Sequence, residues 1–101
     1  MAMLHTVNKS PYETDALESC LAHAREGDIV LLIEDGVYAT IKGGRAAEAL
    51  ASAGGVKIAA LSADLKARGI TPEKMVEGVE VVDYGGFVDL VTENDRVQAW
   101  L

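Results

Sequence analysis

The sequence predicts an α/β domain with three layers, α/β/α, around a central, mainly parallel sheet of four or five strands. Short apolar segments alternate along the chain with segments of helical periodicity, and the connections are short. The longest apolar run, 29–33, has no polar alternation, as expected for a strand covered on both faces of a parallel sheet. With 101 residues, 50% of them hydrophobic, the chain has the size of a single domain, which we assign to residues 1–101.

The first half of the chain contains three expected strands and two expected helices. They are, in order, a strand over 4–7, a helix over 11–26, a strand over 29–33, a helix over 45–52 and a strand over 56–61. The start of the first helix is well signalled, because Ser10 is a good N-cap, Pro11 suits the first helical position and Glu13 completes a capping box. Gly27 is expected to end this helix.

The second half continues the same alternation. The expected elements are a short helix that is capped by Ser62 or Asp64 and ends at Gly69, a helical turn over 71–73, a strand over 79–82, a helix around the apolar residues of 87–91, and either a fifth strand or a packed tail over 97–101. Parallel sheets place their sites at the carboxyl ends of the strands. Here those ends are residues 8–10, 34–38, 62–64 and 83–86.

Charge and composition exclude several classes of function. Sixteen acidic and nine basic residues give a net charge of −7, and the basic residues are spread along the chain, so we expect no direct nucleic-acid binding. We find no secretory signal and no apolar run near the roughly 20 residues that span a membrane, which predicts a soluble, cytoplasmic protein without membrane contact. No phosphate-binding or metal-ligand motif occurs, so no cofactor or metal is expected.

Cys20 is the main candidate for chemistry, because a thiolate can accept sulfur and hold it as a persulfide. The only cysteine of the chain cannot form an internal disulfide, and a cytoplasmic thiol stays reduced. His23 lies one helical turn further on and could assist the thiol. Alternatively, Cys20 is a small core residue and His23 a solvated one.

Other residues receive weaker interpretations. Glu34 and Asp35 could form a catalytic base or a cation site at the end of a buried strand, or simply a turn. Tyr84, Phe87 and Trp100 could anchor a partner or pack in the core.

Five blocks of the sequence, taken together, resemble the DsrH/TusB family. They are MLHTVNKSP at 3–11, GD at 27–28 with LLIEDGVYA at 31–39, DLKARG at 64–69, VDYGGFVDL at 82–90 and VQAW at 97–100. The resemblance covers nearly the whole chain, and the order and spacing of the blocks make it specific. It implies a DsrEFH-like fold and a place in a bacterial sulfur relay that passes persulfide sulfur between protein cysteines.

The resemblance also implies partners and a choice between two pathways. The partners would be DsrE/TusD-like and DsrF/TusC-like subunits in a dimer of heterotrimers, with a DsrC/TusE-type protein as sulfur acceptor. The family divides between oxidation of stored sulfur and 2-thiouridine synthesis at the tRNA wobble base. The DsrH branch carries a cysteine at this point of the first helix, whereas the TusB branch can lack it, so Cys20 favours sulfur oxidation.

Three hypotheses follow for the role of the chain. In the first, Cys20 is a persulfide carrier within a sulfurtransferase complex rather than part of a stand-alone enzyme. In the second, the chain is a non-catalytic subunit that completes the hexamer. The third is a small independent enzyme that uses Glu34 and Asp35.

Overall fold

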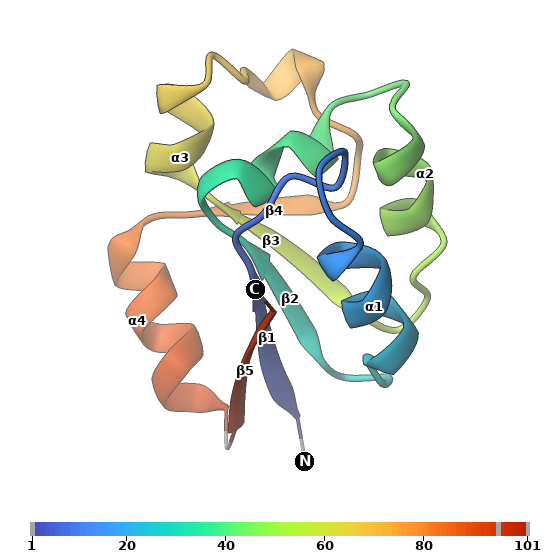
Figure 1. The fold of residues 1–101 in the computed structure, drawn as a ribbon. Helices are drawn as coiled ribbons and strands as arrows, with labels where there is room; N and C mark the ends of the chain where they lie inside the picture. The colour runs from blue at the N-terminus through green and yellow to red at the C-terminus, as the bar shows by residue number, and fades with distance from the viewer. Residues whose placement is uncertain (1, 95, 101) are drawn as a thin grey trace.

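The computed structural model describes residues 2–94 and 96–100 and contains one five-stranded sheet. The strands are β1 (Met3–Val7), β2 (Ile29–Leu32), β3 (Lys57–Leu61), β4 (Val79–Val82) and β5 (Arg96–Trp100). They lie in the order β4-β3-β2-β1-β5, and all the pairings are parallel (Figure 1). The predicted fold class is confirmed, with the closing segment as a fifth strand beside β1; residue 101, which the prediction included, lies outside the described residues.

Helices cover both faces of the sheet, which completes the three layers. The α-helices are α1 (Ala16–His23), α2 (Arg45–Ala51), α3 (Ser62–Ala67) and α4 (Tyr84–Glu93), and the 3-10 helices are η1 (Glu34–Thr40) and η2 (Pro72–Lys74). Figure 1 shows α1 and α2 on one side of the sheet and α4 on the other. None of the helices in the described part of the chain is long and apolar enough to cross a membrane.

The first helix is shorter than the predicted 11–26, and its capping box does not form. The Ser10 side chain accepts a hydrogen bond from the backbone N–H of Tyr12 at 3.2 Å, so Ser10 stabilises a turn rather than a helix start. At the other end, Asp28 accepts the backbone N–H of Arg25 at 3.0 Å and holds the chain extended after His23. The side chain of Asp28 therefore ends the helix before Gly27 is reached.

The segment after β2 forms the 3-10 helix η1, a helix that was not predicted from the sequence. Its backbone crosses the end of β1 closely, because a Cβ atom on Gly36 would overlap the carbonyl oxygen of Val7. A glycine is therefore required at position 36 for this helix to pack against the sheet.

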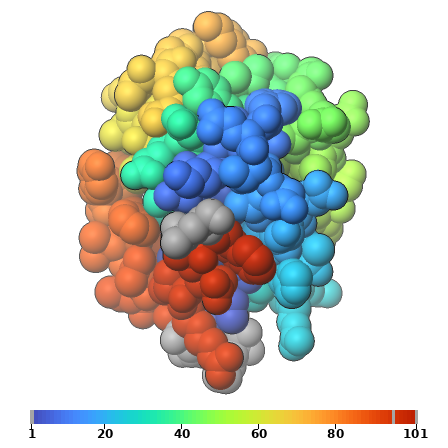
Figure 2. Space-filling model, viewed as in Figure 1, coloured from blue at the N-terminus to red at the C-terminus, as the bar shows by residue number. Residues whose placement is uncertain are grey.

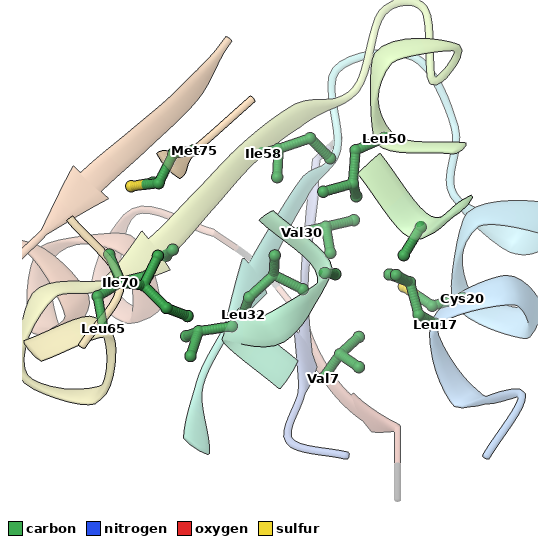
Figure 3. Close-up of a cluster of buried hydrophobic side chains, with 14 of the residues drawn as sticks. Val7, Leu17, Cys20, Val30, Leu32, Leu50, Ile58, Leu65, Ile70 and Met75 are labelled. Carbon is green, nitrogen blue, oxygen red and sulfur yellow. The ribbon is translucent and has the colours of Figure 1, made fainter. Parts of the chain in front are cut away.

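The hydrophobic core has two parts, one on each face of the sheet. The larger part lies under α1, α2, α3 and η1, and includes the inward-facing residues of β1, β2 and β3 (Figure 3). The smaller part consists of Leu4, Leu31 and Ala59 beneath Phe87 and Leu90 of α4. Val30 and Leu32 of β2 pack in the larger part of the core and Leu31 packs in the smaller part, as expected for a central strand covered on both faces.

Candidate functional site

Cys20 lies in the larger core cluster with 0% of its surface exposed. Figure 3 shows it beside Leu17, on the side of α1 that faces the sheet. Burial raises the pKa of the Cys20 thiol to about 12, and the negative charge of Asp28 adds to the shift. At neutral pH the thiolate fraction is then on the order of 10⁻⁵, and the thiolate is the form that attacks sulfur donors.

The His23 ring is not hydrogen-bonded to Cys20, which favours the alternative in which His23 is a solvated residue. Its Nδ1 donates to the carbonyl oxygen of Ser19 at 2.8 Å, and its ring lies 5.5 Å from that of Trp100, between centroids. The imidazole is exposed, whereas the thiol faces the core. The two residues are one turn apart, but α1 turns them to different surroundings.

The structure instead brings together His5 of β1 and Asp28, the residue before β2. His5 is 2% exposed and Asp28 is 6% exposed, and His5 Nε2 lies 2.9 Å from Asp28 Oδ2. The carboxylate also accepts the backbone N–H groups of Met3 and Arg25, each at 3.0 Å. Burial alone would raise the pKa of Asp28, but these hydrogen bonds outweigh it and hold the pKa below its ordinary value of 3.8.

Trp100 fixes the tautomer of His5. The indole Nε1 lies 3.1 Å from His5 Nδ1, and an indole N–H can only donate a hydrogen bond. His5 Nδ1 must therefore accept, so the proton of the neutral ring is on Nε2, which donates to Asp28. The chain Trp100–His5–Asp28 thus ties β5, β1 and the start of β2 together through side chains.

A pocket of about 660 Å³ opens beside this chain of hydrogen bonds. It lies between β5, the start of β1 and the segment that joins α1 to β2, and its lining includes Arg25, Arg96, Gln98 and Trp100. In Figure 2 it opens between the red surface of β5 and the cyan surface that follows α1. The pocket is not at the carboxyl ends of the strands, where the sequence predicted a site.

The carboxyl ends of β2 and β3 do meet, but the carboxylates of Asp35 and Asp64 form structural contacts there. Asp35 pairs with the guanidinium of Arg68 at 2.8 Å, and Asp64 Oδ2 accepts the backbone N–H of Glu34 at 2.8 Å. Arg68 also lies 3.7 Å from Asp64 and over the ring of Tyr38. These contacts favour a structural role for Asp35 over that of a catalytic base. Within the described residues, no three His, Cys, Asp or Glu side chains are grouped so that they could hold a metal ion.

The three aromatic candidates have different environments. Tyr84 is 64% exposed at the start of α4, Phe87 packs against the smaller core cluster, and Trp100 packs against the larger one. Tyr84, Val88 and Val91 are all exposed and recur at helical spacing on the outer side of α4. This apolar stripe is the candidate partner surface; Phe87 and Trp100 belong mainly to the packing of the domain.

Sequence reasoning missed the pairing of His5 with Asp28 and Trp100. The partners are 23 and 95 residues apart, so no local motif contains them. The signal in the sequence was the presence of His5 within one apolar strand and of Asp28 immediately before another. The pairing of these two strands, which brings the two residues together, is seen in the structure.

Comparison with known proteins places the chain in a described group. The model of the DsrH like protein family matches residues 9–97. Proteins named TusB from Pectobacterium parmentieri and Shigella flexneri are each 40% identical over 98 residues, which is 97% of this chain and 100% of theirs.

Solved structures show the same fold at low sequence identity. The crystal structure of the YchN protein of Escherichia coli superposes with a TM-score of 0.81 at 18% identity, covering 98% of both chains. A protein of unknown function from Methanobacterium thermoautotrophicum gives a TM-score of 0.73 at 21% identity, covering 96% of both chains.

Proposed function

Because this chain belongs to the DsrH/TusB family of sulfur-relay subunits, we propose that it is the TusB-type subunit of a relay that serves thiolation of the tRNA wobble base. The observation that carries the choice of pathway is the 40% identity to TusB proteins along their whole length. The presence of Cys20 led us to favour sulfur oxidation, and the matches to TusB support the tRNA alternative better.

In this proposal the chain works in an assembly with TusC-like and TusD-like subunits, and a TusE-type protein accepts the sulfur. The exposed stripe of Tyr84, Val88 and Val91 supports such an assembly. Apolar side chains that recur on one exposed helix face are typical of surfaces that a partner covers.

We further propose that the chain supports the relay without carrying sulfur itself. Cys20 is fully buried, its pKa is raised to about 12, and His23 does not contact it. A persulfide adds a sulfur atom, and because Cys20 is fully buried in a packed cluster, we expect that atom to require a shift of α1 or of the neighbouring side chains. These features favour the second of our three hypotheses, the non-catalytic subunit.

The persulfide-carrier hypothesis for Cys20 remains a prediction with a defined structural requirement. For the thiol to meet a donor, α1 must separate from the sheet, because the sulfur lies on the inner side of that helix. Opening of this kind would expose Leu17 and Val30 along with the thiol.

The test is deletion of the gene for this chain, followed by mass spectrometry of tRNA nucleosides. We expect wobble 2-thiouridine to be lost and to return when the wild-type chain is supplied. Cys20→Ala should restore it equally well, because alanine keeps an apolar side chain at the buried position.

Two results would contradict parts of the proposal. Unchanged thiouridine in the deletion strain, together with failure to oxidise stored sulfur, would favour the DsrH-type pathway instead. Failure of Cys20→Ala to restore thiolation, with the variant folded and assembled, would favour the carrier role of Cys20.

A further inference from the structure

The pocket beside β5 collects positive charge on a chain whose net charge is −7. Arg25, from the segment before β2, and Arg96, the first residue of β5, both line it. Among the contacts of the described residues, neither guanidinium forms an ion pair, whereas Arg68 and Lys57 do. Two arginines from distant parts of the sequence thus line one pocket, and no acidic side chain of residues 2–94 or 96–100 forms an ion pair with either.

Among the described residues that line the pocket, Asp28 is the carboxylate, and its single negative charge leaves the two arginines in excess. Asp28 is 6% exposed and accepts three hydrogen bonds, from Met3 N, Arg25 N and the ring of His5. Its oxygens are therefore directed to donors inside the fold rather than to the arginine side chains. The neutral tautomer of His5 is in turn fixed by Trp100, so this inner wall is fully hydrogen-bonded.

The rest of the lining suits an anion with a flat or apolar group attached. The Gln98 Nε2 donates one hydrogen to the carbonyl oxygen of Ala99 at 3.1 Å and keeps a second N–H as a donor. The rings of His23 and Trp100 form an aromatic side. Arginine guanidinium groups bind the oxygens of phosphate-like anions through paired hydrogen bonds. The volume of about 660 Å³ exceeds that of a bare tetrahedral ion and leaves room for a small organic group.

We infer that this pocket binds a tetrahedral oxyanion between Arg25 and Arg96, with Trp100 as the adjoining aromatic wall. The oxyanion is either free or the end group of a small molecule. This inference stands on the pocket and its charges, and it does not depend on the pathway proposed above.

Trp100 is the only tryptophan of the chain and lines the pocket, so its fluorescence reports on occupancy. The full-length chain is titrated with thiosulfate, inorganic phosphate and phenyl phosphate at constant ionic strength. We expect a saturating change in Trp100 fluorescence, and about tenfold weaker Kd in Arg25→Gln and in Arg96→Gln, since each removes a charge-assisted hydrogen bond.

Arg45→Gln is the matched control, because Arg45 is exposed, lies on α2 and lines a different groove. It removes the same charge and should leave the Kd unchanged. The backbone N–H of Arg25 that holds Asp28 remains in Arg25→Gln, so the fold is kept.

The three ligands separate the two forms of the oxyanion. Tighter binding of phenyl phosphate than of the inorganic ions would identify an oxyanion on an organic group, and similar affinities would identify a free oxyanion. The inference is overturned if no ligand saturates the signal, or if Arg45→Gln weakens binding as much as Arg25→Gln and Arg96→Gln do.

Discussion

At the scale of single residues, the structure assigns different chemistry to Cys20 and Asp28. The Cys20 thiol is inside an apolar cluster, where the charged form is disfavoured. The Asp28 carboxylate is almost as buried, but three hydrogen bonds stabilise its charge. Burial therefore disfavours the thiolate form of Cys20, whereas the hydrogen bonds to Asp28 keep its carboxylate charged and let it stabilise the fold.

We expect Cys20 to react with a thiol reagent only when the protein opens. In native buffer, labelling by Ellman's reagent should be at least about 100-fold slower than in denaturing urea, because opening of a packed helix costs several kcal/mol. The raised pKa adds to this protection, because it keeps the thiol of the closed protein protonated at neutral pH. Labelling in native buffer at the rate of an exposed thiol would contradict this account.

Replacement of Asp28 by Asn should destabilise the domain by about 2 kcal/mol at neutral pH, because an amide has one accepting oxygen and leaves a buried donor of this site unpaired. Its pKa is lower in the folded than in the unfolded chain, so its contribution is present above pH 3.8 and is lost as the pH falls through the folded value. Urea unfolding should therefore show the difference between wild type and Asp28→Asn shrinking below pH 3.8.

Asp89→Asn is the control for this measurement, since Asp89 is an exposed acid on α4. It should change the free energy of unfolding by less than about 0.5 kcal/mol. A destabilisation by Asp28→Asn that is the same at all pH values would argue against a charged Asp28 in the folded state.

At the scale of elements, the strands were easier to predict than the ends of the helices. The apolar run at 29–33 required a central strand, and the structure has one. By contrast, Ser10, Pro11 and Glu13 carry every local signal of a helix start, and yet they form a turn. Ser10 makes its capping hydrogen bond within a turn instead of a helix. At the other end, α1 stops because Asp28, which lies beyond the predicted helix, accepts the backbone N–H of Arg25.

The N-cap residue of α4, Asp83, caps its helix with its side chain, whereas the N-cap residue of α1, Asp15, does not. Asp83 accepts the backbone N–H of Gly86 at 2.8 Å, whereas Asp15 makes no such hydrogen bond. Asp83→Ala should therefore lower the free energy of unfolding by about 1 kcal/mol. Asp15→Ala should have a smaller effect, and equal losses in urea unfolding of the two variants would contradict this assignment.

The apolar stripe on α4 should be needed for assembly rather than for folding. Val88→Lys places a charge at a 57% exposed position, so the isolated chain should fold normally. In the complex with its partner subunits, the same charge would be desolvated, and size-exclusion chromatography should show dissociation.

Ala67→Lys is the matched control for the stripe, because Ala67 is exposed on α3. The complex should remain intact in that variant. Retention of Val88→Lys in an intact complex would exclude the stripe as the assembly surface.

At the scale of the whole molecule, the sheet could be predicted from the sequence but the pocket could not. The alternation of strands and helices predicts a parallel sheet covered on both faces, and this prediction does not depend on which residues lie at the edges of the sheet. The pocket depends on β5 lying beside β1, which brings Trp100 to His5 across 95 residues. The closing segment was predicted only as a strand or a tail, so its side chains could not be assigned to a site.

The molecule as a whole thus combines a protected thiol, a hydrogen-bonded inner wall and an apolar helix face. Cys20 is inside, the stripe of Tyr84, Val88 and Val91 is outside, and the arginine-lined pocket opens at the β5 edge. This arrangement suits a subunit that supports a sulfur relay through contacts with its partners, which is the central claim of our proposal.

The most direct test of this claim is the intact mass of each subunit after the co-purified complex is incubated with a persulfide donor. We predict the added mass of a sulfur atom on a partner subunit and none on this chain. Addition of sulfur to this chain, and its absence in Cys20→Ala, would contradict the claim and establish Cys20 as a carrier.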